Sequence, residues 1–212
     1  MTKLIIILTL FFLSLIFPAR AQKHSSADLQ NLISTIQTAD ETQDLLKLSE
    51  KFDQISKSKP DDWLPLYYAL LTKTFAAFQQ NKEEAMKSAE WLEKRLPELE
   101  KLTQNNSEVI TLKGLISTVK VSKDPINYGQ IMSPYILRDY DFALMLNPKN
   151  PRPMYLKSQF QMISTQYTGG DPKEFCPSMR SAKKLLEEEN KTKPEPHWGE
   201  SQVDEILSTT CM

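Results

Sequence analysis

The sequence predicts an all-α protein built from antiparallel helix hairpins. Apolar residues recur at helical spacing along most of the chain, beginning with Leu29, Leu32, Ile33 and Ile36. No stretch alternates apolar and polar residues in the way that a half-buried strand does. The composition agrees, because valine and glycine are scarce while Lys, Glu, Leu, Gln and Ala, which favour helices, are abundant.

The first 21 residues have the layout of a secretory signal peptide. A basic residue precedes an apolar run over residues 4–17, and Ala19 and Ala21 supply the small residues of a cleavage site. The run is shorter than the ~20 residues that span a bilayer, so an uncleaved anchor is the less favoured alternative. We predict cleavage between Ala21 and Gln22, which leaves residues 22–212 as a single helical domain without a transmembrane segment.

Caps and breakers divide the first half of the chain into five helices, each with an apolar stripe after a residue that can accept hydrogen bonds from free amides. Asn81 with Glu84 is the clearest start, because the pair has the spacing of a capping box. Pro97 leaves open whether residues 96–102 extend that helix or form a separate turn. The expected stripes are 29–36 after Ser25 or Ser26, 45–55 after Asp40, 63–78 after Pro60-Asp61-Asp62, 85–92 after Asn81, and 109–119 after Ser107.

Proline and glycine mark the helices of the second half. Asp124-Pro125 and Ser133-Pro134 each place proline just after a possible cap, where its missing amide does no harm. Residues 147–151 form a turn, and Gly169-Gly170-Asp171-Pro172 is the glycine-dense loop. The expected helices are 134–146, 152–166, 172–190 and, after a proline-bearing connection, 200–209.

Cys176 and Cys211 are predicted to form a disulfide, because a cysteine pair in an oxidising compartment usually does so. The bridge would tie the last helix to the region after the glycine loop and would stabilise the fold by roughly 3–4 kcal/mol. Two free buried thiols are the alternative. Redox catalysis is not indicated, since the chain contains no C-x-x-C.

Three stretches share one register, in which a small or apolar residue is followed twelve positions later by a proline. The pairs are Ala85 with Pro97, Ile136 with Pro148 and Ala182 with Pro194, and the clearest stretch is YDFALMLNPKNPR at 140–152. Together with Leu112 and Gly114, these features resemble the tetratricopeptide (TPR) repeat over residues 61–194. The prolines are 51 and 46 residues apart instead of about 34, so the repeats are degenerate.

The layout of residues 147–152, Gly169-Gly170 and Pro196-His197-Trp198-Gly199 more specifically resembles a group of exported TPR-like proteins of Gram-negative bacteria, which has no assigned activity. The resemblance implies a short right-handed solenoid of hairpins. It also implies location in the periplasm, or secretion otherwise.

Two loops are candidate binding sites. Tyr167 and Gly169-Gly170 precede a helix whose N-terminus would favour an anion. The alternative is a tight loop between helices, capped by Asp171, that has only a structural role. Trp198, beside His197, is either an exposed anchor for a partner or the closure of one end of the core.

A row of aromatic residues over 63–78 could line a concave groove or belong to the core, and Tyr68, which lies off the main stripe, is expected to face outward. His197 with Cys176 and Cys211 matches no zinc spacing, and the paired glutamates are typical of solvated helix faces.

These observations favour a non-enzymatic periplasmic scaffold that binds a protein or peptide partner and uses no cofactor or metal. One alternative is a small-molecule binder or enzyme that uses the Gly169-Gly170 loop with Trp198. Another is a structural component of the envelope. Nucleic acid is not expected as a partner, because the chain has no excess of basic residues.

Overall fold

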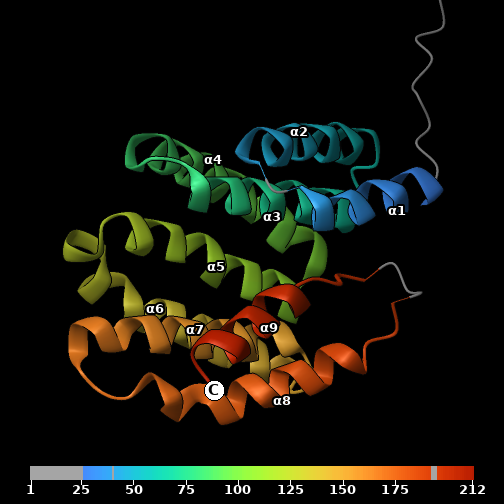
Figure 1. Cartoon of the computed structure of the whole chain (residues 1–212). Helices are drawn as coiled ribbons and strands as arrows, with labels where there is room; N and C mark the ends of the chain where they lie inside the picture. The colour runs from blue at the N-terminus through green and yellow to red at the C-terminus, as the bar shows by residue number, and fades with distance from the viewer. Residues whose placement is uncertain (1–25, 40, 192–194) are drawn as a thin grey trace, which may run out of the picture.

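The computed structural model describes residues 26–39, 41–191 and 195–212, and within these ranges every regular element is helical (Figure 1). The predicted cleavage between Ala21 and Gln22 lies outside the described residues and stays a prediction. None of the described helices is long and apolar enough to cross a membrane. The elements are α1 (Ser26–Ser34), η1 (Thr35–Thr38), α2 (Thr42–Ser58), α3 (Trp63–Gln79), α4 (Lys82–Thr103), α5 (Ser107–Lys123), α6 (Pro125–Leu146), α7 (Pro151–Thr168), η2 (Pro172–Phe175), α8 (Cys176–Glu187) and α9 (Glu200–Thr209).

Consecutive helices from α2 to α9 pack against each other as antiparallel pairs, as the repeat pattern predicts. Figure 1 shows α2, α3 and α4 at one end of the stack and α8 at the other, with α9 drawn between α5 and α8. Helix α5 also contacts both α3 and α7, so these three helices form one continuous layer, which we call the inner layer. The right-handed superhelix of TPR proteins stays a prediction.

Asparagine and aspartate cap most of these helices. Asn81 accepts a hydrogen bond from the Glu84 amide, as expected. The expected cap of α5 is wrong by one residue, because Asn106 accepts from the Glu108 amide while Ser107 donates to the Ala143 carbonyl at 2.8 Å. Ser107 is therefore the first residue of α5 and joins it to α6, but it does not cap its own helix.

Two prolines lie inside helices. Helix α4 continues through Pro97, which settles the question left open by the sequence. The predicted start at Pro134 is wrong, because α6 begins at Pro125 and passes through Pro134 without ending. Pro134 is exposed, so the carbonyl that loses its amide partner can be hydrated, and this lowers the penalty of proline within a helix.

Small residues of the repeat register lie where helices cross closely. A Cβ atom on Gly114 would come within 2.7 Å of the Tyr140 ring, so glycine here lets α5 approach α6. Ala85 and Ala89 of α4 are fully buried in a small cluster with Ala77 and Val119. The Leu-Gly and alanine positions that resemble TPR contacts are therefore real helix contacts.

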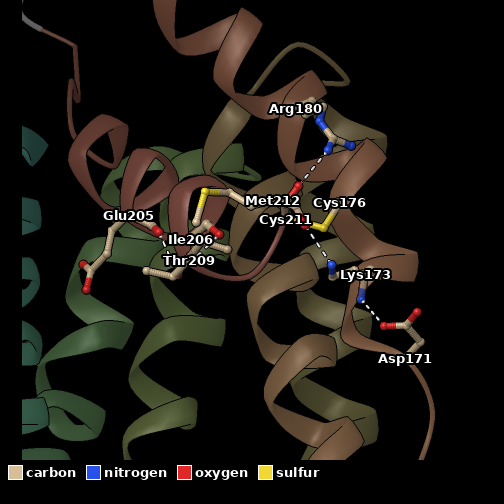
Figure 2. Close-up of a disulfide and its surroundings, with 9 residues drawn as sticks. All are labelled: Asp171, Lys173, Cys176, Arg180, Glu205, Ile206, Thr209, Cys211 and Met212. Carbon is tan, nitrogen blue, oxygen red and sulfur yellow. Dashed lines mark hydrogen bonds between the residues drawn. A yellow bond between two sulfur atoms is a disulfide. The ribbon is translucent and has the colours of Figure 1, made fainter.

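The predicted disulfide between Cys176 and Cys211 is present (Figure 2). It joins the start of α8 to the residues after α9. Figure 2 shows two basic side chains that bind the last two residues of the chain. Arg180 donates to the Cys211 carbonyl at 3.0 Å, and Lys173 donates to the Met212 carbonyl at 2.7 Å. The last two residues, Cys211 and Met212, are thus held to η2 and α8 by one covalent and two polar contacts.

Candidate functional site

A buried arginine organises the polar interior. Arg152, in the first turn of α7, is 1% exposed, and its Nη1 and Nη2 atoms donate to Glu189 Oε1 at 2.6 and 2.7 Å. Its Nη2 also donates to the Pro196 carbonyl, and its Nε lies 3.3 Å from Glu108 Oε2 without hydrogen-bond geometry. One guanidinium therefore balances two carboxylates that come from α5 and from the residues after α8.

Burial and mutual attraction set the protonation of this cluster. Burial raises the pKa of the Glu108 carboxyl, and the positive charge of Arg152 opposes that rise only in part. Burial alone would lower the pKa of Arg152, but the attraction of Glu108 and of the neighbouring acidic groups raises it on balance. Burial, followed by the charge of Glu108, raises the pKa of Tyr67. Arg152 therefore stays charged, and Tyr67 stays a neutral hydrogen-bond donor.

Trp198 closes the core over this cluster. Its Nε1 donates to the Tyr67 hydroxyl at 2.9 Å, and that hydroxyl donates to Glu108 Oε2 at 3.2 Å. The indole packs edge-on against the rings of Phe75 and Tyr155, 5.5 and 6.1 Å between centroids. Trp198 thus takes the second of its two expected roles. The segment that carries it lies on residues of α3 and α7, both in the inner layer.

The residues on either side of Trp198, His197 and Gly199, are also held by contacts with the rest of the fold. His197 Nδ1 lies 3.4 Å from Glu189 Oε2, and the side chain is largely buried. Gly199 has a φ of +106°, and a Cβ there would come within 2.6 Å of the Tyr155 ring. Only glycine satisfies both conditions without strain.

Tyr68 does not face outward, so this expectation is wrong. It is 1% exposed, its ring stacks on Phe52 of α2 at 5.4 Å, and its hydroxyl lies 3.5 Å from the Glu195 carbonyl oxygen. The physical reason is that α2 and α4 pack on α3 from two sides while residues 195–199, which we call the C-terminal segment, cover a third. A helix surrounded in this way buries residues that lie off its main stripe.

A hollow of about 680 Å³ lies beside Trp198, between η1, the end of α3 and the start of α9. His197 and Trp198 both line it. Its acidic side chains are already paired: Lys183 contacts Glu200 at 3.1 Å and Asp204 at 2.9 Å. Its mixed lining and existing ion pairs give no specific indication of a ligand.

A second and larger hollow, of about 990 Å³, is lined mainly by apolar side chains, and we call it the apolar groove. One face of α6 and one face of α7 form its two long walls, with the end of α5 and the tip of α3 between them. Its apolar lining includes Phe78, Leu115, Ile126, Leu137, Phe160 and Ile163. Ile126 and Tyr167 are 91% and 69% exposed, so large apolar surface is left open to solvent.

The glycine loop lies at one end of this groove. Tyr167, Gly169 and Gly170 all line it, whereas Tyr68, His197 and Trp198 do not. Gly169 and Gly170 have positive φ angles of 76° and 114°, which explains the glycine pair. The loop leads into the four-residue turn η2, capped by Asp171, and not directly into a helix. The expected anion site at a helix start is therefore not what the loop forms.

Sequence reasoning missed two features of the site. Arg152 belongs to the Asn-Pro-Arg junction, but its partners are far away in the chain, and nothing local indicates them. The α6 wall of the groove was missed as well, although apolar residues off a buried stripe, such as Ile126, are a usable signal. The described residues contain no group of His, Cys, Asp and Glu that could hold a metal ion.

No family model matches the chain, and no curated protein is similar to it in sequence. Among solved structures, the fold is similar to that of the HusA haemophore from Porphyromonas gingivalis. The TM-score is 0.77, the match covers 88% of this chain and 92% of that chain, and the sequences are 24% identical. At this identity the similarity establishes a shared all-α fold.

Proposed function

We propose that this chain binds a porphyrin, such as haem, in the apolar groove and carries it without changing it. The observation that carries the proposal is the open groove between α6 and α7, with Ile126, Ile163 and Tyr167 exposed along it. A porphyrin ring is flat and largely apolar, and apolar clefts of this size suit such ligands. The shared fold with a haemophore supports the same ligand class.

Apolar burial is sufficient to drive the binding. Each 100 Å² of apolar surface removed from water contributes roughly 2.5 kcal/mol, so burial of about 400 Å² contributes roughly 10 kcal/mol. Association costs offset several kcal/mol of this amount. With a cost of about 4 kcal/mol, the remainder of about 6 kcal/mol corresponds to a dissociation constant of tens of micromolar. No bond to iron is required for this estimate.

If iron is bound, Tyr167 is the candidate ligand. Phenolate is one of the side chains that hold haem iron, and the described groove residues include no histidine, cysteine or methionine. The other tyrosines of the lining, Tyr140 and Tyr155, are buried, and burial raises the pKa of both phenols. Tyr167 is the exposed phenol of the three.

The test is a titration of the exported protein with ferric haem and with metal-free mesoporphyrin, followed by porphyrin absorbance and tryptophan fluorescence. Ile163→Glu places a charge in the groove and should weaken both ligands at least tenfold, because the carboxylate would be desolvated. Ile131→Glu, at an exposed isoleucine of α6 outside the groove lining, is the matched control and should leave affinity unchanged. Lack of saturable binding, or equal effects of the two variants, would rule the proposal out.

A second comparison tests the iron ligand. Tyr167→Phe should change the spectrum of the ferric haem complex but not the affinity for metal-free mesoporphyrin. Tyr135→Phe, at another exposed tyrosine that does not line the groove, should change neither. An unchanged haem spectrum in the Tyr167 variant would show that Tyr167 is not an iron ligand.

The scaffold that binds a protein or peptide is the weaker candidate. TPR-type scaffolds bind their partners on the inner layer, but here residues 196–199 cover part of that layer through Trp198. A peptide would have to displace these contacts. The porphyrin proposal needs no displacement, because the groove is open.

Export to the periplasm belongs to the same proposal. The predicted signal peptide and the Cys176–Cys211 bridge both fit an oxidising compartment. Mass spectrometry of the protein recovered from the cell envelope should give a mature chain that begins at Gln22. A chain that retains residues 1–21 would contradict this part of the proposal.

A further inference from the structure

We infer, on the premise that the groove holds a porphyrin, that it accepts the uncharged edge of the ring and leaves the carboxylates in water. The groove should therefore select porphyrins whose carboxylates all lie on one edge. It should discriminate against those that carry carboxylates around the whole ring. The inference rests on how the polar groups of the groove are already used.

The serine and threonine hydroxyls that line the groove bond to carbonyl groups of their own helices. Thr118 donates to the Gly114 carbonyl at 2.9 Å, Ser164 to the Phe160 carbonyl at 2.7 Å, and Thr165 to the Met162 carbonyl at 2.6 Å. Ser122, Ser133 and Thr168 donate to backbone carbonyls in the same manner. A hydroxyl has one hydrogen to donate, so these groups can offer a carboxylate little.

The charged residues of the groove also favour a ligand that keeps its carboxylates outside. Glu174 is the one charged residue among the described residues that line it, and its sign repels an anion. Four lysines and one arginine are next to lining residues in the chain, and each already has a partner. Lys123 and Lys173 donate to the carbonyls of Phe78 and Met212, both at 2.7 Å. Lys120, Arg138 and Lys157 pair with Glu93, Asp139 and Asp141.

A carboxylate inside such a groove would lose its hydration without gaining a cation. The donors that remain, the Tyr167 hydroxyl and the amides of Gln130, Gln159, Gln161 and Gln202, are neutral and cannot balance its charge. Burial of an ionised carboxylate without partners is strongly unfavourable, so the ligand should turn its charged edge outward. A ring with carboxylates on every side cannot do so. Each carboxylate forced into the groove should weaken binding at least about tenfold, even if only part of that penalty applies.

Three ligands test the inference on the folded, disulfide-bonded protein in one dilute non-ionic detergent. They are mesoporphyrin IX, with its carboxylates on one edge, its uncharged dimethyl ester, and coproporphyrin I, with carboxylates on all four pyrroles. We expect the first two to bind within about threefold of each other and the third at least about tenfold more weakly. Binding of mesoporphyrin should depend little on salt, since no ion pair is formed.

A gain-of-function variant strengthens the test. Gln130→Lys adds a cation at an exposed lining position of α6 and should tighten coproporphyrin I at least about threefold, with little effect on the ester. Gln54→Lys, at an exposed site of α2 outside the groove lining, is the matched control and should change nothing.

The outcomes separate this inference from the proposed function. If mesoporphyrin binds but its ester binds at least tenfold more weakly, the protein recognises carboxylates and the inference is wrong. Equal binding of coproporphyrin I and mesoporphyrin also overturns it, while porphyrin binding itself stands. If none of the three ligands binds, the proposed function fails and the inference fails with it.

Discussion

Replacing Arg152 with methionine should be among the most damaging single changes in the molecule. The variant keeps an apolar side chain but loses both hydrogen bonds to Glu189, the bond to the Pro196 carbonyl and the ion pair with Glu108. Removing one partner of a buried ion pair costs about 3–5 kcal/mol, because the other charge stays buried. Glu108 and Glu189 are each 17% exposed, so partial hydration places the expected cost near the lower end, about 3 kcal/mol.

Chemical and thermal unfolding followed by circular dichroism measures this cost. For a chain of this size, 3 kcal/mol lowers the melting temperature by roughly 6–12 °C. The bond to Pro196 also holds the segment that carries Trp198, so tryptophan fluorescence should change before the helical signal does. Arg138→Met is the matched control: Arg138 is exposed and 3.6 Å from Asp139, and its loss should cost about 0–1 kcal/mol.

A double-mutant cycle identifies the source of the cost. If the unpaired carboxylates cause the damage, adding Glu189→Gln to Arg152→Met should recover about 1 kcal/mol or more. A cost below about 1 kcal/mol for Arg152→Met, or one equal to that of the Arg138 control, would refute the reasoning. The cluster would then be a by-product of packing and not a support for the C-terminal segment.

Three further predictions concern stability. Replacing Cys176 and Cys211 with serine should lower the free energy of unfolding by about 3–4 kcal/mol, and reductant should have the same effect on the wild type only. Gly114→Ala should lower the free energy of unfolding by about 1–3 kcal/mol, because its Cβ would meet the Tyr140 ring. Gly129→Ala, with no atom within 4 Å of its Cβ, should raise it by about 0.5–1 kcal/mol. Equal effects of the two variants would contradict the close approach of α5 to α6. Burial raises the pKa of Glu108 above its ordinary value of 4.5, so the folded state favours the protonated carboxyl. The contribution of this group to the free energy of unfolding is therefore fully present below pH 4.5 and is lost as the pH rises through the folded pKa. Unfolding titrations should therefore show the stability difference between wild type and Glu108→Gln falling as pH rises, and a rising difference would mean that attraction to the neighbouring arginine outweighs burial.

The helices could be predicted because their signals are local. A capping side chain acts within three residues of the helix start, as Asn81 does, and an apolar stripe needs only one buried face. The burial of Tyr68 could not be predicted in this way, since it depends on how many other helices surround α3. The continuation of α6 through Pro134 was missed for a related reason: the proline rule describes an isolated helix, and packing of α6 against α5 and α7 overrides it.

The candidate site was predictable only in part. Tyr167 and the glycine pair were singled out, and they do line the apolar groove, because exposed turn residues are visible in sequence. Its other wall, on α6, comes from a helix some 30–40 residues earlier, and only tertiary structure brings the two together. Arg152 shows the same limit, since the partner Glu189 lies 37 residues further along the chain.

The arrangement separates the residues that stabilise the fold from those proposed to bind the ligand. Arg152 and Trp198 hold the C-terminal segment on the inner layer, where a helical scaffold would otherwise offer a surface to a peptide. Open apolar surface remains in the groove, at side chains such as Ile126 that contribute little to the core because solvent already reaches them. Changing Ile126 or Ile163 should therefore alter ligand affinity with little effect on unfolding, and changing Arg152 should do the reverse. A peptide that bound the part of the inner layer under residues 196–199 would not show this division, because it would compete with that segment for the same surface.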